Sequence, residues 1–379
     1  MFHIQKDISI LVVILSIALV VPSVVTANDT SMNTQVLETA TPTPTGASPF
    51  NVVFTLQDNA LQSADLTTHQ KRNLSTLDVK TLGSDVSQIV LDQTNNVLYV
   101  VANMGQFNNP LKAQGPNPMR IVRISMVDGK KDIVFERSNL DKVIPSPDGQ
   151  NFLVTYYEGD LGKSRLLLCI FNVQTRKCAD YNNKRLASDN VHWINNQSFA
   201  ILEMSDRSIQ IVDSLTLTEK RLMGLDDWFI LTVTPIPATH LLLVGAKSRK
   251  PSDSHPLQLF TLDWDTSQIQ VLSFAILGDR FKDYYGLEFS PNGKLFFYNS
   301  DEKLYMVEFP NGKLIATIDK VSQAQWLPDS RTFVVNTYDR SEGSSITDIV
   351  DAQTGKITSS TKNAPHVPVI IARTIPKLP

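Results

Sequence analysis

The sequence predicts an all-β fold, a seven-bladed β-propeller in which one blade is made from both ends of the chain. Two kinds of turn alternate along the chain, and each is bounded by short runs rich in β-branched and aromatic residues. The five periods between residues 96 and 331 average about 47 residues, which is typical of a four-stranded propeller blade. Long amphipathic helical stretches are missing from the sequence.

The first kind of turn is built from Asp, Asn, Gly and Pro, which tolerate or pre-set the dihedral angles of tight turns. Its copies lie at residues 92–96, 146–149, 195–197, 235–239, 290–293 and 328–330. An apolar run follows each copy, as in residues 97–101 and 152–156. These runs are apolar on both alternating faces, so we expect strands in a sheet interior that is packed on each side.

The second kind of turn follows strands that alternate more clearly, such as residues 121–125, and we expect it to close an outer strand pair. Its copies lie at residues 128–130, 172–177, 213–218, 263–267, 310–313 and 351–356. The repeating unit is therefore strand, turn, strand, loop, strand, turn, strand. Six complete units fit between residues 86 and 360.

The two chain ends supply the material for a further blade. Residues 51–55 and 74–77 read as strands around another turn at residues 65–71, and residues 367–371 read as a lone strand. Pairing the lone strand with the N-terminal strands would close the ring and remove open sheet edges. The alternative is a six-bladed propeller with both ends outside the ring.

Two groups of segments carry a resemblance to known propellers. Ser146-Pro-Asp-Gly149 before Phe152 and Ser290-Pro-Asn-Gly293 before Leu295 resemble the repeats of bacterial TolB-like and WD40-like propellers. Residues 96–99, 120–124 and 128–129 are similar in style to YWTD and NHL repeats. The resemblance covers most of residues 50–372, but it concerns only the order of turns and strands in each repeat. The Gly-His and Trp-Asp pairs of true WD40 repeats are missing. It implies a fold, and a fold does not determine a function.

The N-terminal segment has the pattern of an export signal. An apolar run over residues 8–21 precedes small residues at Val25 and Ala27, which predicts a signal peptide over residues 1–27. Retention of residues 8–25 as a membrane anchor is the alternative. Residues 28–49 form a Thr/Pro-rich stretch that predicts a disordered linker, and residues 50–379 form the propeller. We therefore expect a secreted, periplasmic or cell-surface protein.

Charge and motif content narrow the function classes. The formal net charge is −3 without long runs of one sign, so nothing predicts nucleic-acid binding. Phosphate-binding loops, a nucleophile elbow and metal-ligand spacings are missing from the sequence, and we predict no cofactor and no metal. We expect a monomer.

Two residue types give local site predictions. Cys169 and Cys178 flank a turn on neighbouring antiparallel strands, so an exported protein can join them in a disulfide. The alternative is a pair of small buried side chains. His192 lies in a predicted inner strand and is a candidate for the central channel, although a structural role is the simpler interpretation.

Long loops are the main functional indication. The connections from second to third strand, at residues 103–118, 158–164, 246–256 and 339–345, share one face with the connections between blades. Blade connections at residues 226–229 and 279–285 carry residue types enriched in binding hot spots. With His192, the ligand-binding candidates are Asp227, Trp228, Arg280, Asp283, Tyr284 and Tyr285. For each, packing between blades is the alternative interpretation.

These observations favour a non-catalytic binding or scaffold module outside the cytoplasm, with a protein, peptide or glycan held on the loop face. The alternative is a propeller enzyme, such as a lactonase or a glycan hydrolase or lyase, with its active site at the channel mouth. A structural surface protein displayed on the linker is a third hypothesis.

Overall fold

The computed structural model separates the chain into two units, Met1–Thr45 and Gly46–Pro379. The structure describes residues 52–57, 60–65, 71–76, 85–92, 94–103, 118–159, 165–181, 186–203, 205, 207–249, 258–272, 284–300, 302–339, 344–362, 369–371 and 373–375. All of these belong to the second unit. The expected signal peptide, the alternative anchor and the Thr/Pro-rich linker lie outside the described residues.

Six sheets, called blades 1 to 6 below, are each built from four consecutive antiparallel strands. Blade 1 contains β4 (Asp85–Asp92), β5 (Val97–Asn103), β6 (Pro118–Ser125) and β7 (Lys131–Ser138). Blade 2 contains β8 (Leu140–Pro145), β9 (Asn151–Glu158), β10 (Arg165–Asn172) and β11 (Lys177–Tyr181). Blade 3 contains β12 (Leu186–Trp193), β13 (Ser198–Glu203), β14 (Ile209–Asp213) and β15 (Glu219–Arg221).

The second half of the repeat follows the same order. Blade 4 contains β16 (Trp228–Pro235), β17 (Leu241–Ser248), β18 (Gln258–Asp263) and β19 (Ile269–Leu272). Blade 5 contains β20 (Tyr284–Phe289), β21 (Leu295–Ser300), β22 (Lys303–Glu308) and β23 (Leu314–Asp319). Blade 6 contains β24 (Val321–Trp326), β25 (Thr332–Asp339), β26 (Ser344–Asp351) and β27 (Ile357–Lys362).

A further sheet, the terminal sheet, joins the two ends of the chain. Its strand order is β28 (Val369–Ile371), β1 (Val52–Gln57), β2 (Ala60–Asp65) and β3 (Lys71–Thr76). β28 pairs with β1 in antiparallel fashion, as the sequence predicts for these segments. The sequence did not predict β29 (Arg373–Ile375), which adds to blade 1 as a parallel neighbour of β4.

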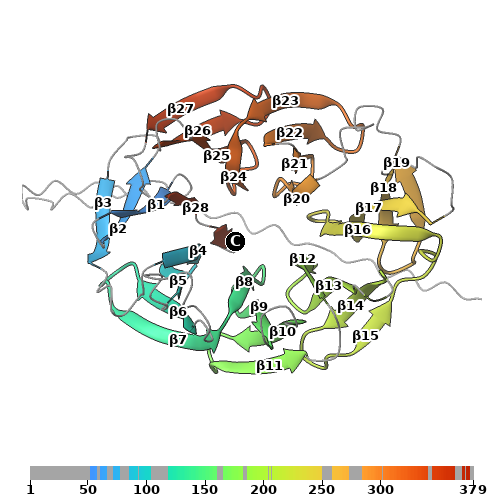
Figure 1. Ribbon diagram of the computed structural model, residues 1–379, viewed down its shortest axis with the longest axis horizontal. Helices are drawn as coiled ribbons and strands as arrows, with labels where there is room; N and C mark the ends of the chain where they lie inside the picture. Colours follow the sequence, from blue (N-terminus) through green and yellow to red (C-terminus); the bar gives the residue numbers. More distant parts are fainter. Residues whose placement is uncertain are drawn as a thin grey trace, which may run out of the picture. The chain divides into compact units, whose positions relative to one another are not determined.

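The first strand of each blade lies nearest the centre of a ring (Figure 1). Contacts join β4 to β8, β8 to β12, β12 to β16 and β16 to β20. β28 contacts both β4 and β24. The prediction of an all-β β-propeller is therefore confirmed as a fold, with six blades of consecutive strands and the terminal sheet in addition. The expected number of seven blades is not supported, because within the described residues only six sheets contain four consecutive strands.

Apolar clusters fill the space between neighbouring blades, which explains why the central strands are apolar on both faces. One cluster joins blades 1 and 2 through Tyr99 and Phe152, whose rings meet edge to face at 4.8 Å. Similar clusters join blades 2 and 3, 3 and 4, 4 and 5, and 5 and 6. The buried aromatic and aliphatic side chains thus hold the ring together through the hydrophobic effect.

Side chains on the inner strands add polar links between blades. The Gln88 side chain donates to the carbonyl of Val143 and accepts from its amide, and Asn190 does the same toward Leu231 and Val233. Trp193 donates its indole N–H to Ile144 O at 2.9 Å, and Trp326 donates to Glu288 O at 3.1 Å. These bonds satisfy inner-strand backbone groups that have no neighbouring strand on that side.

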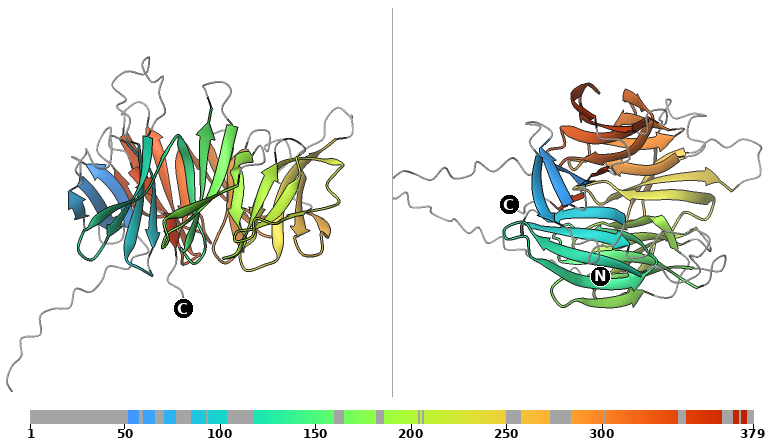
Figure 2. Two further views of the ribbon diagram at one scale, coloured as in Figure 1. Left: turned by 90° about the horizontal axis from the view of Figure 1, so that it is seen from below. Right: turned by 60° about the vertical axis from the view of Figure 1, so that its left-hand side comes forward.

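The strands run between two faces of the ring, as the edge-on view shows (Figure 2). The turn face carries the connections from first to second and from third to fourth strand. The loop face carries the connections from second to third strand and from blade to blade, so every inner strand of blades 1 to 6 begins there. Within the described part of the chain, no helix is long and apolar enough to cross a membrane.

Candidate functional site

The loop face of blades 3 and 4 contains the described part of the predicted binding surface. Residues 225–228 turn into β16, with the Trp228 amide donating to Leu225 O at 3.0 Å. Trp228 and Phe229 open the strand, so their side chains point to opposite faces of blade 4.

The Trp228 side chain, a ligand-binding candidate in the sequence analysis, packs inward between two blades. Its ring centroid lies 5.5 Å from that of Phe260, and the side chain packs against the buried cluster between blades 3 and 4. The side chain is half-buried. Packing between blades therefore accounts for most of the Trp228 side chain.

Phe229 is the exposed aromatic of this surface. It is 40% exposed, although it is a large apolar side chain in a strand. The Arg207 guanidinium, from the connection between β13 and β14 in blade 3, lies 4.6 Å from the centre of the Phe229 ring. This cation–π contact joins two blades at the surface and presents a flat ring beside a positive charge.

Arg249 holds the segment that carries Asp227. Its backbone amide donates to Asp227 O at 2.8 Å, and its Nε donates to Trp228 O at 2.9 Å. The loop after β17 therefore fixes the backbone at the start of β16. Asp227 is exposed, and the neighbouring Asp226 faces Arg221 at 3.8 Å. Charged residues of both signs therefore border the start of β16, whose backbone Arg249 holds in place.

The other predicted residues separate into three groups. Tyr284 and Tyr285 open β20, which lies beside β16, so their backbone belongs to the same face. Arg280 and Asp283 lie outside the described residues. His192 is the second-last residue of β12, near the turn face.

The fold does not place His192 close to the other candidate residues. Asn190 is bonded to Leu231 and Val233, which aligns β12 with the middle of β16. At about 3.3 Å per residue, His192 is then roughly 15–20 Å along the strands from Trp228. His192 and Trp228 therefore lie toward opposite faces of the ring.

Sequence reasoning missed Arg207, Phe229 and Arg249 as members of this surface. Phe229 was visible only as the neighbour of Trp228, and the strand alternation sends the two rings in opposite directions. Arg207 and Arg249 come from loops of different blades. Only the blade packing shows that they meet at β16.

The disulfide lies elsewhere, at the junction of blades 1 and 2. Cys169 and Cys178 are joined with a Cα–Cα distance of 5.7 Å. Cys169 pairs with Asp180 and Cys178 with Phe171, so the bond runs diagonally between β10 and β11. A loop of this length stabilises the fold by about 2–3 kcal/mol.

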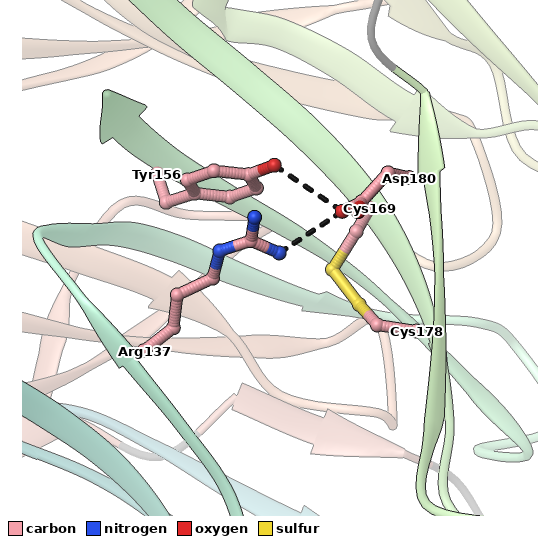
Figure 3. The surroundings of a disulfide bond; sticks show 5 residues. All are labelled: Arg137, Tyr156, Cys169, Cys178 and Asp180. Atoms are coloured by element: carbon pink, nitrogen blue, oxygen red, sulfur yellow. Dashed lines mark hydrogen bonds and ion pairs between the residues drawn. A yellow bond between two sulfur atoms is a disulfide. The ribbon is translucent and has the colours of Figure 1, made fainter. Parts of the chain in front are cut away.

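A charged contact lies beside this disulfide (Figure 3). Arg137 of β7 donates to Asp180 Oδ1 at 2.9 Å, and its guanidinium lies 3.6 Å from the centre of the Tyr156 ring. The Tyr156 hydroxyl donates to the same oxygen at 3.2 Å. Burial raises the pKa of Tyr156 to about 12 despite the opposing effect of Arg137, so the hydroxyl remains a neutral donor at physiological pH.

This group does not form a metal site. Ligand atoms of Cys169, Cys178 and Asp180 lie within 4.8 Å of one another. However, the two sulfur atoms are bonded to each other, and Asp180 is engaged by Arg137 and Tyr156. Thiolate ligands are therefore not available. The arrangement links two blades.

Comparisons with known proteins support the fold and do not identify a function. No protein-family model matches the sequence, and no curated protein is significantly similar to it. Among solved structures, an oligogalacturonate lyase in complex with manganese has a TM-score of 0.56 at 11% identity, covering 81% of this chain and 83% of that chain. The β-propeller domain of Cps50 (Swd1) from Myceliophteria thermophila has a TM-score of 0.51 at 13% identity, covering 75% and 87%.

TolB from Acinetobacter baumannii has a TM-score of 0.45 at 13% identity. The match covers 84% of this chain and 65% of the TolB chain, so this chain spans just under two thirds of that protein. All three likenesses are at low identity. The two structures with TM-scores above 0.5, the lyase and the Cps50 domain, support the β-propeller fold of this chain.

Proposed function

We propose that this protein is a non-catalytic binding propeller that holds a protein, peptide or glycan on the loop face of blades 3 and 4. The observation that carries the proposal is Phe229, an exposed ring under the Arg207 guanidinium at 4.6 Å. Aromatic and Arg side chains dominate binding hot spots because they offer large, rigid contact areas. The Trp228 packing and the Arg249 hydrogen bonds hold this surface in one conformation, which lowers the entropy lost on binding.

Pull-down and glycan-array binding by residues 28–379 tests the proposal. Phe229→Ala and Arg207→Ala are each expected to weaken binding at least about tenfold. Leu215→Ala is the matched control, because Leu215 is 79% exposed and lies on the turn face of blade 3. Binding that survives both loop-face variants would contradict this surface, and turnover of lactones or oligosaccharides would contradict the non-catalytic function.

We also propose that the protein is exported. The apolar run over residues 8–21 and the Cys169–Cys178 disulfide support this, since disulfides persist in oxidising compartments. N-terminal sequencing of the mature protein is expected to begin at Asn28. A mature chain that retains Met1 in the membrane fraction would instead establish the anchor.

The terminal sheet, in this proposal, acts as a seventh blade. β28 contacts the inner strands of blades 1 and 6, which is what a closing blade requires.

A further inference from the structure

Blades 5 and 6 meet through an interface that is aromatic near the turn face. Phe297 of β21 stacks on Trp326 with ring centroids 5.4 Å apart, and lies 6.0 Å from Phe333 of β25. Phe297 and Phe333 are therefore at the same level of the facing strands. Two residues further toward the loop face, β21 carries Asn299 and β25 carries Val335, on the same faces as these two rings.

Asp348 of β26 points into this interface. It is the direct partner of Val335, and directly opposed residues share one face of a sheet. Val335 packs in the cluster between blades 5 and 6 with Leu304, which is the strand partner of Asn299. The carboxyl group of Asp348 and the amide of Asn299 thus approach one interface from opposite blades, at neighbouring levels.

Both groups present unsatisfied oxygen atoms. Asp348 is 6% exposed, and its Oδ1 is inaccessible without a hydrogen-bond partner. Asn299 Oδ1 is likewise buried and unpartnered. Among the described residues, no Lys or Arg forms an ion pair with Asp348. A buried carboxylate oxygen without a donor or counter-charge is strongly disfavoured, and no described side chain bonds to Asp348 Oδ1 or Asn299 Oδ1, so the two atoms point to a bound partner.

We propose that a calcium ion binds between blades 5 and 6, with the Asp348 carboxylate and Asn299 Oδ1 among its ligands. Both unsatisfied atoms are acceptors, which excludes another acceptor as the partner. Water can donate to them, but it leaves the carboxylate charge uncompensated beside Leu304 and Val335. A hard cation binds both oxygen atoms and compensates the carboxylate charge, since oxygen atoms are its preferred ligands. Calcium in particular tolerates irregular sites that carbonyls and water complete.

The ion would fasten blade 5 to blade 6, and blade 6 in turn contacts the terminal sheet through β24 and β28. Calcium sites of extracellular modules have dissociation constants of about 0.1–1 mM, so such a site suits an exported protein. The inference concerns stability and does not depend on the ligand of the loop face.

Thermal unfolding and calorimetric titration of residues 28–379 test the proposal. After EDTA treatment, about 5 mM CaCl2 is expected to raise the unfolding midpoint by roughly 3 °C or more, with one ion bound and a smaller effect of MgCl2. Asp348→Asn is expected to abolish the calcium response. Asp319→Asn is the matched control, because Asp319 is exposed and forms its ion pair with Lys303 outside this interface.

Asn299→Asp provides a second variant in case Asp348→Asn fails to fold. A second carboxylate is expected to bind calcium about tenfold more tightly and to lower the midpoint in EDTA through charge repulsion. A wild-type midpoint that does not respond to calcium would overturn the proposal. So would an Asp348→Asn protein that is as stable as wild type in EDTA and still binds the ion, since a buried water or a neutral acid then suffices.

Discussion

A single turn design recurs at the third-to-fourth connections of blades 2, 3, 4 and 6. An Asp or Asn side chain accepts the amide of a Thr three residues later at 2.8 Å in all four turns, which begin at Asn172, Asp213, Asp263 and Asp351. The residue one further on has a left-handed backbone, at Arg176, Leu217, Ser267 and Gly355. Only one of these four is glycine, so the first three carry the steric cost of a Cβ in that conformation.

The left-handed positions allow a test of this cost. Ser267→Gly is expected to stabilise the protein by about 0.5–1 kcal/mol, because φ is +60° there. Gly355→Ala should destabilise it by about 3 kcal/mol, because φ is +68° and the new Cβ would meet Ala316 Cβ at 2.3 Å. Urea unfolding measures both changes. A Ser267→Ala control should show no gain, and stabilisation by Gly355→Ala would contradict the argument.

The same turns predict how stability depends on acid. The hydroxyl or amide of the following Thr lowers the pKa of Asp213, Asp263 and Asp351, and bonds from Ser125 and Lys130 lower that of Asp128 to about 2. A lowered folded-state pKa stabilises the protein above the unfolded pKa near 3.8. This contribution is lost as the pH falls through the folded pKa.

Replacing Asp213, Asp263 and Asp351 by Asn should flatten the acid limb of the stability profile between about pH 5 and about pH 2. Asn172 already forms the same turn without a charge, so the variants should keep the fold. Urea midpoints across this range provide the measurement. An unchanged slope in the triple variant would show that other carboxylates control acid unfolding.

At the scale of the strand, the inner strands bond to the next blade through side chains. Trp193→Phe should lower the free energy of unfolding by about 2 kcal/mol, since it leaves the Ile144 carbonyl without its indole donor. Trp264→Phe is a matched control: both tryptophans are 8% exposed, but Trp264 donates no indole hydrogen bond within the described part of the chain. Equal losses in the two variants would assign the effect to packing alone.

At the scale of the whole molecule, the proposed closure of the ring by the terminal sheet depends on the last strands of the chain. β28 pairs with β1, and β29 pairs with β4, so a short C-terminal segment connects the terminal sheet to blade 1. Deleting residues 367–379 should lower the unfolding midpoint by about 5 °C or more and broaden the transition, because it opens the ring. Deleting residues 376–379 is the control. A truncated protein with an unchanged midpoint would contradict closure by the terminal sheet.

Much of this organisation could be predicted from local sequence. The Asp, Asn, Gly and Pro turns and the apolar runs between them predict the four-stranded units, because turn dihedrals and strand alternation depend on neighbouring residues. The pairing of the two chain ends was also predictable, since each end supplied an incomplete blade. The position of β29 was not, because a three-residue segment has no pattern of its own.

The candidate site was less accessible to the sequence. Trp228 was a reasonable candidate by residue type, but the packing of blade 4 half-buries its ring and exposes Phe229 beside Arg207. The unsatisfied oxygens of Asn299 and Asp348 likewise depend on which faces of blades 5 and 6 meet.

Periodicity alone was therefore enough for the strands, the turns and the class of fold, because each depends on interactions within a few residues or between adjacent strands. The surfaces on which binding is proposed arise between blades, from residues roughly 20 to 50 positions apart. Their distances and burial depend on the angle and register at which neighbouring sheets pack. That geometry is a property of the assembled ring and has no local signature in the chain.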